Sequence, residues 1–167
     1  IFSILNTRFA APGAQSLLLQ QVAVVACLAI GQTLIILTAG IDLSVGALLA
    51  VAGVVAAALS PRGTLIAIAA GVGSAALLGM ASGLVIAKAR IQPFVVTLAM
   101  MIAARGVALA ATSEQSVAVA GDATGLTWLG RGWIGPIPVP VVLLLLAYAL
   151  GWVVLRYTTF GRHVYAV

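Results

Sequence analysis

The sequence predicts an all-α, polytopic transmembrane helical bundle. Of the 167 residues, 63% are hydrophobic and only 7% are charged, and the mean hydropathy is +1.26. A soluble domain of this size cannot bury that much apolar surface, so the surrounding solvent is expected to be lipid. Lipid admits only helices and closed barrels, because their backbone polar groups are satisfied internally. Strand-type alternation is absent and Ala, Leu, Val and Gly dominate, so helices are expected.

Five apolar segments approach the roughly twenty residues that a helix needs to cross a bilayer. They are expected at about 17–39, 45–59, 65–87, 94–111 and 139–155. The second segment is short, and the sequence leaves open whether it crosses fully or re-enters. A long external loop is expected at about 112–138, and its end, residues 135–140, contains three prolines and should be extended.

Residues typical of helix ends separate these segments. Gly40 is expected to take the left-handed conformation that ends the first helix. Asp42 or Ser44 can accept a hydrogen bond from the backbone donors that open the second helix. Residues 60–63, Ser-Pro-Arg-Gly, should form a turn, and Pro93 suits the first turn of the fourth helix. The bundle is therefore expected to be broken around Gly40–Ser44.

The distribution of basic residues predicts how the chain is oriented across the membrane. If every segment crosses, one side holds Lys88, Arg90, Arg156 and Arg162, and the other holds Arg8, Arg62 and Arg131. The positive-inside rule favours the cytoplasm for the larger group. The segment at 112–138, with Trp128 and Trp133, then lies outside.

Asp42 stands among about forty otherwise uncharged residues, and ionisable groups inside a bilayer are functional candidates by default. As a helix cap, Asp42 would be stabilised by the helix dipole. As a pathway residue, it would bind substrate or gate a cavity. Both roles are compatible, because discontinuous helices line transport sites.

Further polar residues lie within the apolar segments. Arg105 either extends to a surface or pairs with an acid, and Asp42 is the only acid inside a predicted apolar run. Four uncharged residues can bind the hydroxyls of a neutral substrate or join helices to one another: Gln32, Thr33, Thr38 and Ser44.

Small residues predict close helix packing. Gly79 and Gly83 form a GxxxG motif, which Gly71 and Ala75 extend along one helix face. Gly46 follows the expected break and is a further packing candidate. The same face would serve either packing within the bundle or dimerisation.

Enzymatic chemistry is not indicated. The sequence has no HExxH, GxSxG or Walker A motif, so ATP hydrolysis by the P-loop route is excluded. His163 and Cys27 are the only residues of their types, so a metal cluster or a disulfide framework within the chain is not expected. We expect this chain to bind no cofactor.

Several stretches, in order, resemble one family. Residues 31–38 followed by Gly-Ile-Asp-Leu-Ser-Val-Gly at 40–46 resemble the signature of ABC transporter permeases for ribose, xylose, arabinose and fructose. Residues 83–88, residues 91–101 with Arg105-Gly106, and residues 159–166 also fit this family.

The resemblance implies the N-terminal half of a bacterial inner-membrane permease, so residues 1–167 would be a partial transmembrane domain. Two permease copies would dock two cytoplasmic ABC ATPases, which bind the ATP, and a periplasmic binding protein would deliver a monosaccharide. The loop that docks the ATPase would follow residues 161–166. The sugar is left open. A branched-chain amino-acid permease on the same scaffold, an ion channel or passive pore, and a structural membrane subunit are the alternatives.

Overall fold

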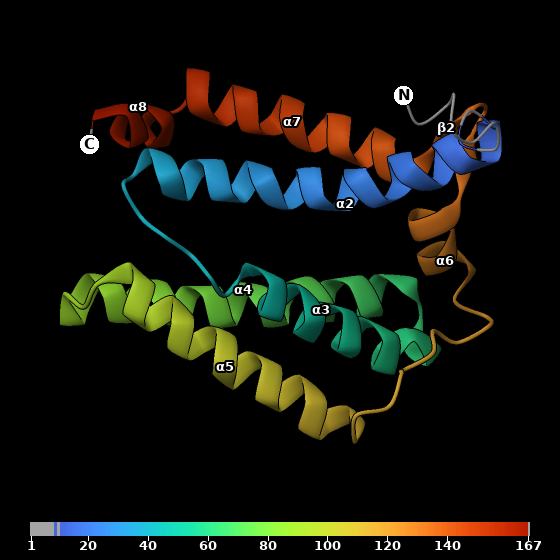
Figure 1. Cartoon of the computed structure of the whole chain (residues 1–167), viewed down its shortest axis with the longest axis horizontal. Coiled ribbons are helices and arrows are strands. Elements are labelled where there is room, and N and C mark those ends of the chain that lie inside the picture. The colour runs from blue at the N-terminus through green and yellow to red at the C-terminus, as the bar shows by residue number, and fades with distance from the viewer. Residues whose placement is uncertain (1–8, 10, 167) are drawn as a thin grey trace. The chain divides into compact units, whose positions relative to one another are not determined.

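The computed structural model describes residue 9 and residues 11–166, and most of this part of the chain is helical. Five of its helices are long and apolar enough to cross a membrane. They are α2 (Pro12–Leu37), α3 (Val45–Leu59) counted together with the 3-10 helix η2 (Ser60–Arg62) that continues it, α4 (Thr64–Ala89), α5 (Pro93–Thr112) and α7 (Val139–Tyr157) (Figure 1). The all-α, polytopic fold class is thereby confirmed. Arg8, used above for orientation, lies outside the described residues.

The shorter elements are the 3-10 helix η2 (Ser60–Arg62), α6 (Thr124–Arg131), β1 (Trp133–Ile134), β2 (Ile137–Pro138) and α8 (Thr159–Ala166). The range expected as a loop, 112–138, thus contains a short helix and a small hairpin. In the hairpin, Trp133 pairs with Pro138 and Ile134 with Ile137. Gly135 makes the turn at φ 60°, a conformation that suits glycine.

The chain forms two compact units, which we describe separately. Within the described residues, the first unit comprises residues 9 and 11–38 together with 128–166. Here α2 runs alongside α7, and α8 continues past the end of α7 and contacts it (Figure 1). Gly151 allows the close approach of the two long helices, because a Cβ there would lie 3.3 Å from Ile30 Cγ2.

The second unit, residues 39–127, packs α3 against both α4 and α5. Small side chains form its core: Ala47, Val51, Ala104 and Ala108. Small residues let helix backbones approach closely where lipid provides no hydrophobic drive for association. The closest approach is at Gly71, where a Cβ would lie 2.7 Å from the carbonyl oxygen of Ala52 and 3.1 Å from Ala56 Cβ.

The GxxxG motif itself is more open than Gly71. A Cβ at Gly79 would meet only Leu48 Cδ1, at 3.9 Å, and nothing lies within 4 Å of one at Gly83. The tight helix contact therefore falls at the extension of the small-residue face and not at the motif.

Ser60 joins the segment that follows α5 to the end of α3. Its hydroxyl donates to the carbonyl oxygen of Ala57 (2.7 Å) and accepts the backbone N–H of Ala120 (2.8 Å). Ser60 is only 1% exposed, so both bonds are shielded from solvent. The connection before α6 is thus anchored by a specific buried hydroxyl.

The outer surface is strongly apolar. Leu65 is 80% exposed, Val25 67% and Leu150 65%, while the buried positions are mostly Ala, Ser and Val. This distribution reverses that of soluble proteins and fits a bundle whose solvent is lipid. The chain is a multi-pass membrane protein.

The break after α2 is present, but its left-handed residue is Ala39 (φ 55°). The prediction that Gly40 takes this conformation was wrong by one residue. Helix α2 ends at Leu37 and Thr38 is its C-cap residue, so the first position beyond the cap is Ala39. The Thr38 hydroxyl donates to the Ile35 carbonyl oxygen (2.9 Å). Because alanine carries a Cβ, it adopts this conformation at a cost that glycine avoids.

Candidate functional site

The break between α2 and α3 is organised by Asp42. Its Oδ1 accepts the backbone N–H of Ser44 (2.7 Å) and the Ser44 hydroxyl (2.6 Å). Ser44 is the N-cap of α3 and is 1% exposed, whereas Asp42 is half-buried. The expected side-chain cap of α3 is not formed: Asp42 accepts from Ser44, which is itself the N-cap residue, and Ser44 acts as a donor. The carboxylate therefore fixes the start of α3 through an Asx-type turn.

Thr97 links this break to α5. Its hydroxyl lies 3.2 Å from the carbonyl oxygen of Ile41 and 2.8 Å from that of Pro93, one turn earlier on α5. Thr97 is 3% exposed. The residue before Asp42 is thus held by a buried hydroxyl from a distant part of the sequence. Sequence reasoning missed Thr97; the available signal was a lone hydroxyl within the apolar run at 91–101.

Arg105 lies on the same unit and lines a groove of about 420 Å³ between α3 and α5. The opposite wall consists of small residues of α3, Gly46, Ala47 and Ala50, together with Leu43. Met101, Ala108 and Leu109 complete the lining, so Arg105 is its only charged residue. The groove begins one residue after Asp42. A direct pair between Arg105 and Asp42 stays a prediction.

The remaining candidates, Gln32, Thr33 and Thr38, belong to α2 and its cap, in the first unit. The Thr33 hydroxyl donates to the carbonyl oxygen of Ala29 (2.8 Å) in its own helix. Thr33 also lines an apolar hollow of about 210 Å³ with Tyr148, Gly151 and Trp152 of α7. Their proposed contact with a substrate stays a prediction.

The groups gathered at these sites are suited to binding a solute. In the described part of the chain no group of three or more His, Cys, Asp or Glu residues could hold a metal ion. What the second unit offers is a helix start held by an Asx-type turn, a buried threonine and a mostly apolar groove with one guanidinium. Discontinuous helices beside such cavities are typical of membrane transport proteins.

The fold and this site define a polytopic membrane protein with the features of a transport subunit. Residues 16–167 match the model of the family described as branched-chain amino acid transport system / permease component. The chain belongs to this family of permeases.

Curated relatives carry the names of sugar permeases. The ribose import permease protein RbsC of Bacillus subtilis is 42% identical over 172 residues, which cover 100% of this chain and 52% of the relative. The galactofuranose transporter permease protein YtfT of Escherichia coli K12 is 41% identical, over 90% of this chain and 44% of the relative. The fructose import permease protein FrcC of Rhizobium meliloti is 35% identical, over 98% of this chain and 48% of the relative. The chain spans about half the length of these relatives, and no solved structure matches it.

Proposed function

We propose that this chain is one half of the membrane permease of an ATP-driven, binding-protein-dependent monosaccharide importer. The observation that carries the proposal is the shared substrate class of its relatives. Ribose, galactofuranose and fructose differ in ring and stereochemistry, yet the permeases named for them are 35–42% identical to this chain. A monosaccharide is the substrate common to them.

The groove beside the break fits an uncharged solute. Arg105 supplies hydrogen-bond donors for sugar hydroxyls, and the small side chains of α3 leave space for a ring. An amino acid carries both a carboxylate and an ammonium group, so an amino-acid permease should need more fixed charge near the pathway than Asp42 and Arg105 provide. The description of the family names branched-chain amino acids, which makes such a permease the second candidate.

The mechanism proposed is alternating access driven from outside the chain. The sequence lacks a Walker A motif, so we assign ATP binding and hydrolysis to a separate cytoplasmic ABC ATPase and no cofactor to this chain. A second permease copy and a periplasmic sugar-binding protein complete the proposed complex. The proposed location is the bacterial inner membrane, with Lys88, Arg90, Arg156 and Arg162 on the cytoplasmic side.

The decisive experiment is uptake by vesicles that contain the intact permease with its ATPase and binding protein. Labelled pentoses, hexoses and leucine would be offered with and without ATP on the cytoplasmic side. ATP-dependent uptake of one sugar, lost without the binding protein, supports the proposal. Uptake of leucine alone identifies an amino-acid permease, and flux without nucleotide identifies a channel.

The role of the groove is tested by Arg105→Gln. Losing hydrogen bonds from a charged donor costs about 1.5–3 kcal/mol, so sugar uptake at low concentration should fall by about 10- to 150-fold. Lys88→Gln, which removes the same charge at the exposed end of α4, is the matched control and should leave uptake within about twofold. Equal uptake by the two variants would remove Arg105 from the pathway.

A further inference from the structure

A second basic hollow lies where α7 ends and α8 begins. Its volume is about 560 Å³, and it is lined by Leu155, Arg156, Tyr157, Arg162, Tyr165 and Ala166. Both arginines and both tyrosines are exposed. Two guanidinium groups, on two successive helices, thus face one open hollow together with two phenol rings.

The chain's fold brings these groups together locally. Gly161 of α8 is buried, and a Cβ at this position would overlap the backbone carbonyl of Leu155. The Gly161 N–H also donates to the Thr158 hydroxyl (3.2 Å) between the two helices. This close turn between α7 and α8 places Arg162 beside the same hollow as Arg156.

The charge of this hollow is not balanced by carboxylate side chains of its own unit. The sequence contains three acidic residues, Asp42, Glu114 and Asp122, and all three belong to the other unit. Residues 1–38 and 128–167 contain no Asp or Glu. Arginine pairs best with planar or tetrahedral oxyanions, which it binds through two parallel N–H donors.

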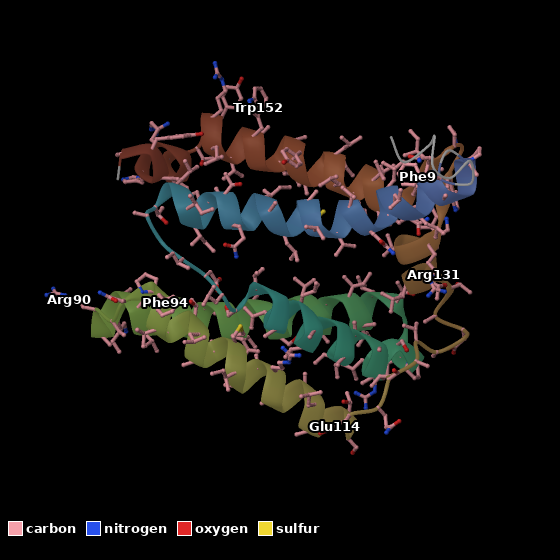
Figure 2. All side chains as sticks on the ribbon, viewed as in Figure 1. Phe9, Arg90, Phe94, Glu114, Arg131 and Trp152 are labelled. Atoms are coloured by element: carbon pink, nitrogen blue, oxygen red, sulfur yellow. The ribbon has the colours of Figure 1, made fainter. Side chains whose placement is uncertain are left out.

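The end of helix α7 indicates where the hollow lies across the membrane. Arg156 and Tyr157 end a 19-residue apolar helix, so they lie where the hydrocarbon region gives way to headgroups. Trp152 and Tyr157 stack edge to face, with ring centroids 5.5 Å apart and planes at 83°. Figure 2 shows Trp152 pointing outward from α7. Tryptophan and tyrosine in this position are typical of the membrane–water interface.

We propose that this hollow binds the phosphate of an anionic lipid headgroup. Arg156 and Arg162 hold the phosphodiester, and the hydroxyls of Tyr157 and Tyr165 donate to its oxygens. The lipid is favoured over free phosphate because its acyl chains extend along the exposed apolar surface of α7, where Trp152 is 56% and Val153 43% exposed. The proposal does not depend on which solute the protein transports.

The test is native mass spectrometry of the intact protein titrated with dioleoyl phosphatidylglycerol and with dioleoyl phosphatidylcholine. A basic residue near an anionic lipid surface contributes a factor of about five in binding. The double variant Arg156→Gln/Arg162→Gln should therefore lose about 25-fold in affinity for phosphatidylglycerol and keep its affinity for phosphatidylcholine. Arg131→Gln is the matched control, because Arg131 is exposed, belongs to the same unit and lies outside the hollow (Figure 2).

The outcomes separate the alternatives. Loss of the phosphatidylglycerol preference in the double variant and its retention in Arg131→Gln support the site. A loss of about fivefold in Arg131→Gln, the same loss per charge as in the double variant, would show diffuse attraction to charge and overturn the site. Displacement of the lipid by millimolar inorganic phosphate would overturn the lipid as occupant. If the double variant keeps its lipid preference but no longer co-purifies with the ATPase, the hollow is assigned to that partner instead. Unaltered elution from a sizing column and unaltered helicity confirm that the variants fold.

Discussion

The Asp42 carboxylate and Ser44 are joined by two hydrogen bonds, in which one oxygen accepts both the backbone N–H (2.7 Å) and the hydroxyl (2.6 Å) of the serine. An isolated charge is costly in a membrane, and these bonds, together with the N-terminal dipole of α3, offset part of that cost. The relationship therefore explains how an acid is tolerated beside the apolar helix α3. Asp42 therefore has two properties that variants can test separately: its oxygen, which accepts the bonds from Ser44, and its negative charge.

Asp42→Ala removes the acceptor of two hydrogen bonds from Ser44, and it should lower the free energy of unfolding by about 1 kcal/mol. Asp42→Asn keeps an oxygen in the same place and should lower it by less than about 0.5 kcal/mol. Thermal unfolding of the purified protein in detergent measures both. If Asp42→Asn is as stable as the parent and yet abolishes ATP-dependent uptake, the charge itself serves transport. Equal destabilisation by both variants would contradict the role of the Asp42 oxygen as the acceptor that stabilises the start of α3.

Thr97→Val should loosen the break, because the carbonyl of Ile41 loses a buried donor at a cost of about 1 kcal/mol. Hydrogen exchange of peptides that cover residues 39–44 should become about fivefold faster. Thr112→Val is the matched control on the same helix, since its hydroxyl bonds to Ala108 and Leu109 of α5 itself. Unchanged exchange at 39–44 in Thr97→Val would show that this contact does not hold the break.

Gly71→Ala should destabilise the second unit by about 1–3 kcal/mol, because the added Cβ meets the Ala52 carbonyl at 2.7 Å and the backbones must separate. Gly83→Ala adds a Cβ in open space, so its higher helix propensity should stabilise α4 by up to about 1 kcal/mol. The melting temperatures of the two variants should therefore shift in opposite directions. A loss of dimer in Gly83→Ala, seen by light scattering, would instead assign the GxxxG face to an intermolecular contact.

Ala39→Gly should raise the free energy of unfolding by up to about 1 kcal/mol, because Ala39 has φ 55° and glycine takes this conformation without a clash of its Cβ. Gly40→Ala is the companion variant. It should be close to neutral, since Gly40 is not among the residues with positive φ. Chemical denaturation followed by circular dichroism gives both values, and a destabilised Ala39→Gly would mean that the break needs the rigidity of alanine.

Much of the fold follows from composition and from residues at helix ends. Five apolar runs predict five helices, and the observed helix at Val45–Leu59 has the expected bounds. Pro93 begins α5, as its fixed φ and missing N–H favour. The helix at Thr124–Arg131 was not anticipated, because it is short and its formation depends on contacts such as Gly125 against Thr64.

The sequence by itself determined that the chain lies in lipid and where its long helices are, since hydropathy and helix period are local properties of the chain. It also singled out Asp42, because one acid among apolar residues is conspicuous without any structure. Only the tertiary structure decided that Thr97 reaches Ile41, that Gly71 and not Gly83 is the tight contact, and that two arginines line one hollow. These relationships join residues that are distant in sequence or separated by a turn, and helix packing sets them through interatomic distances that no local pattern encodes.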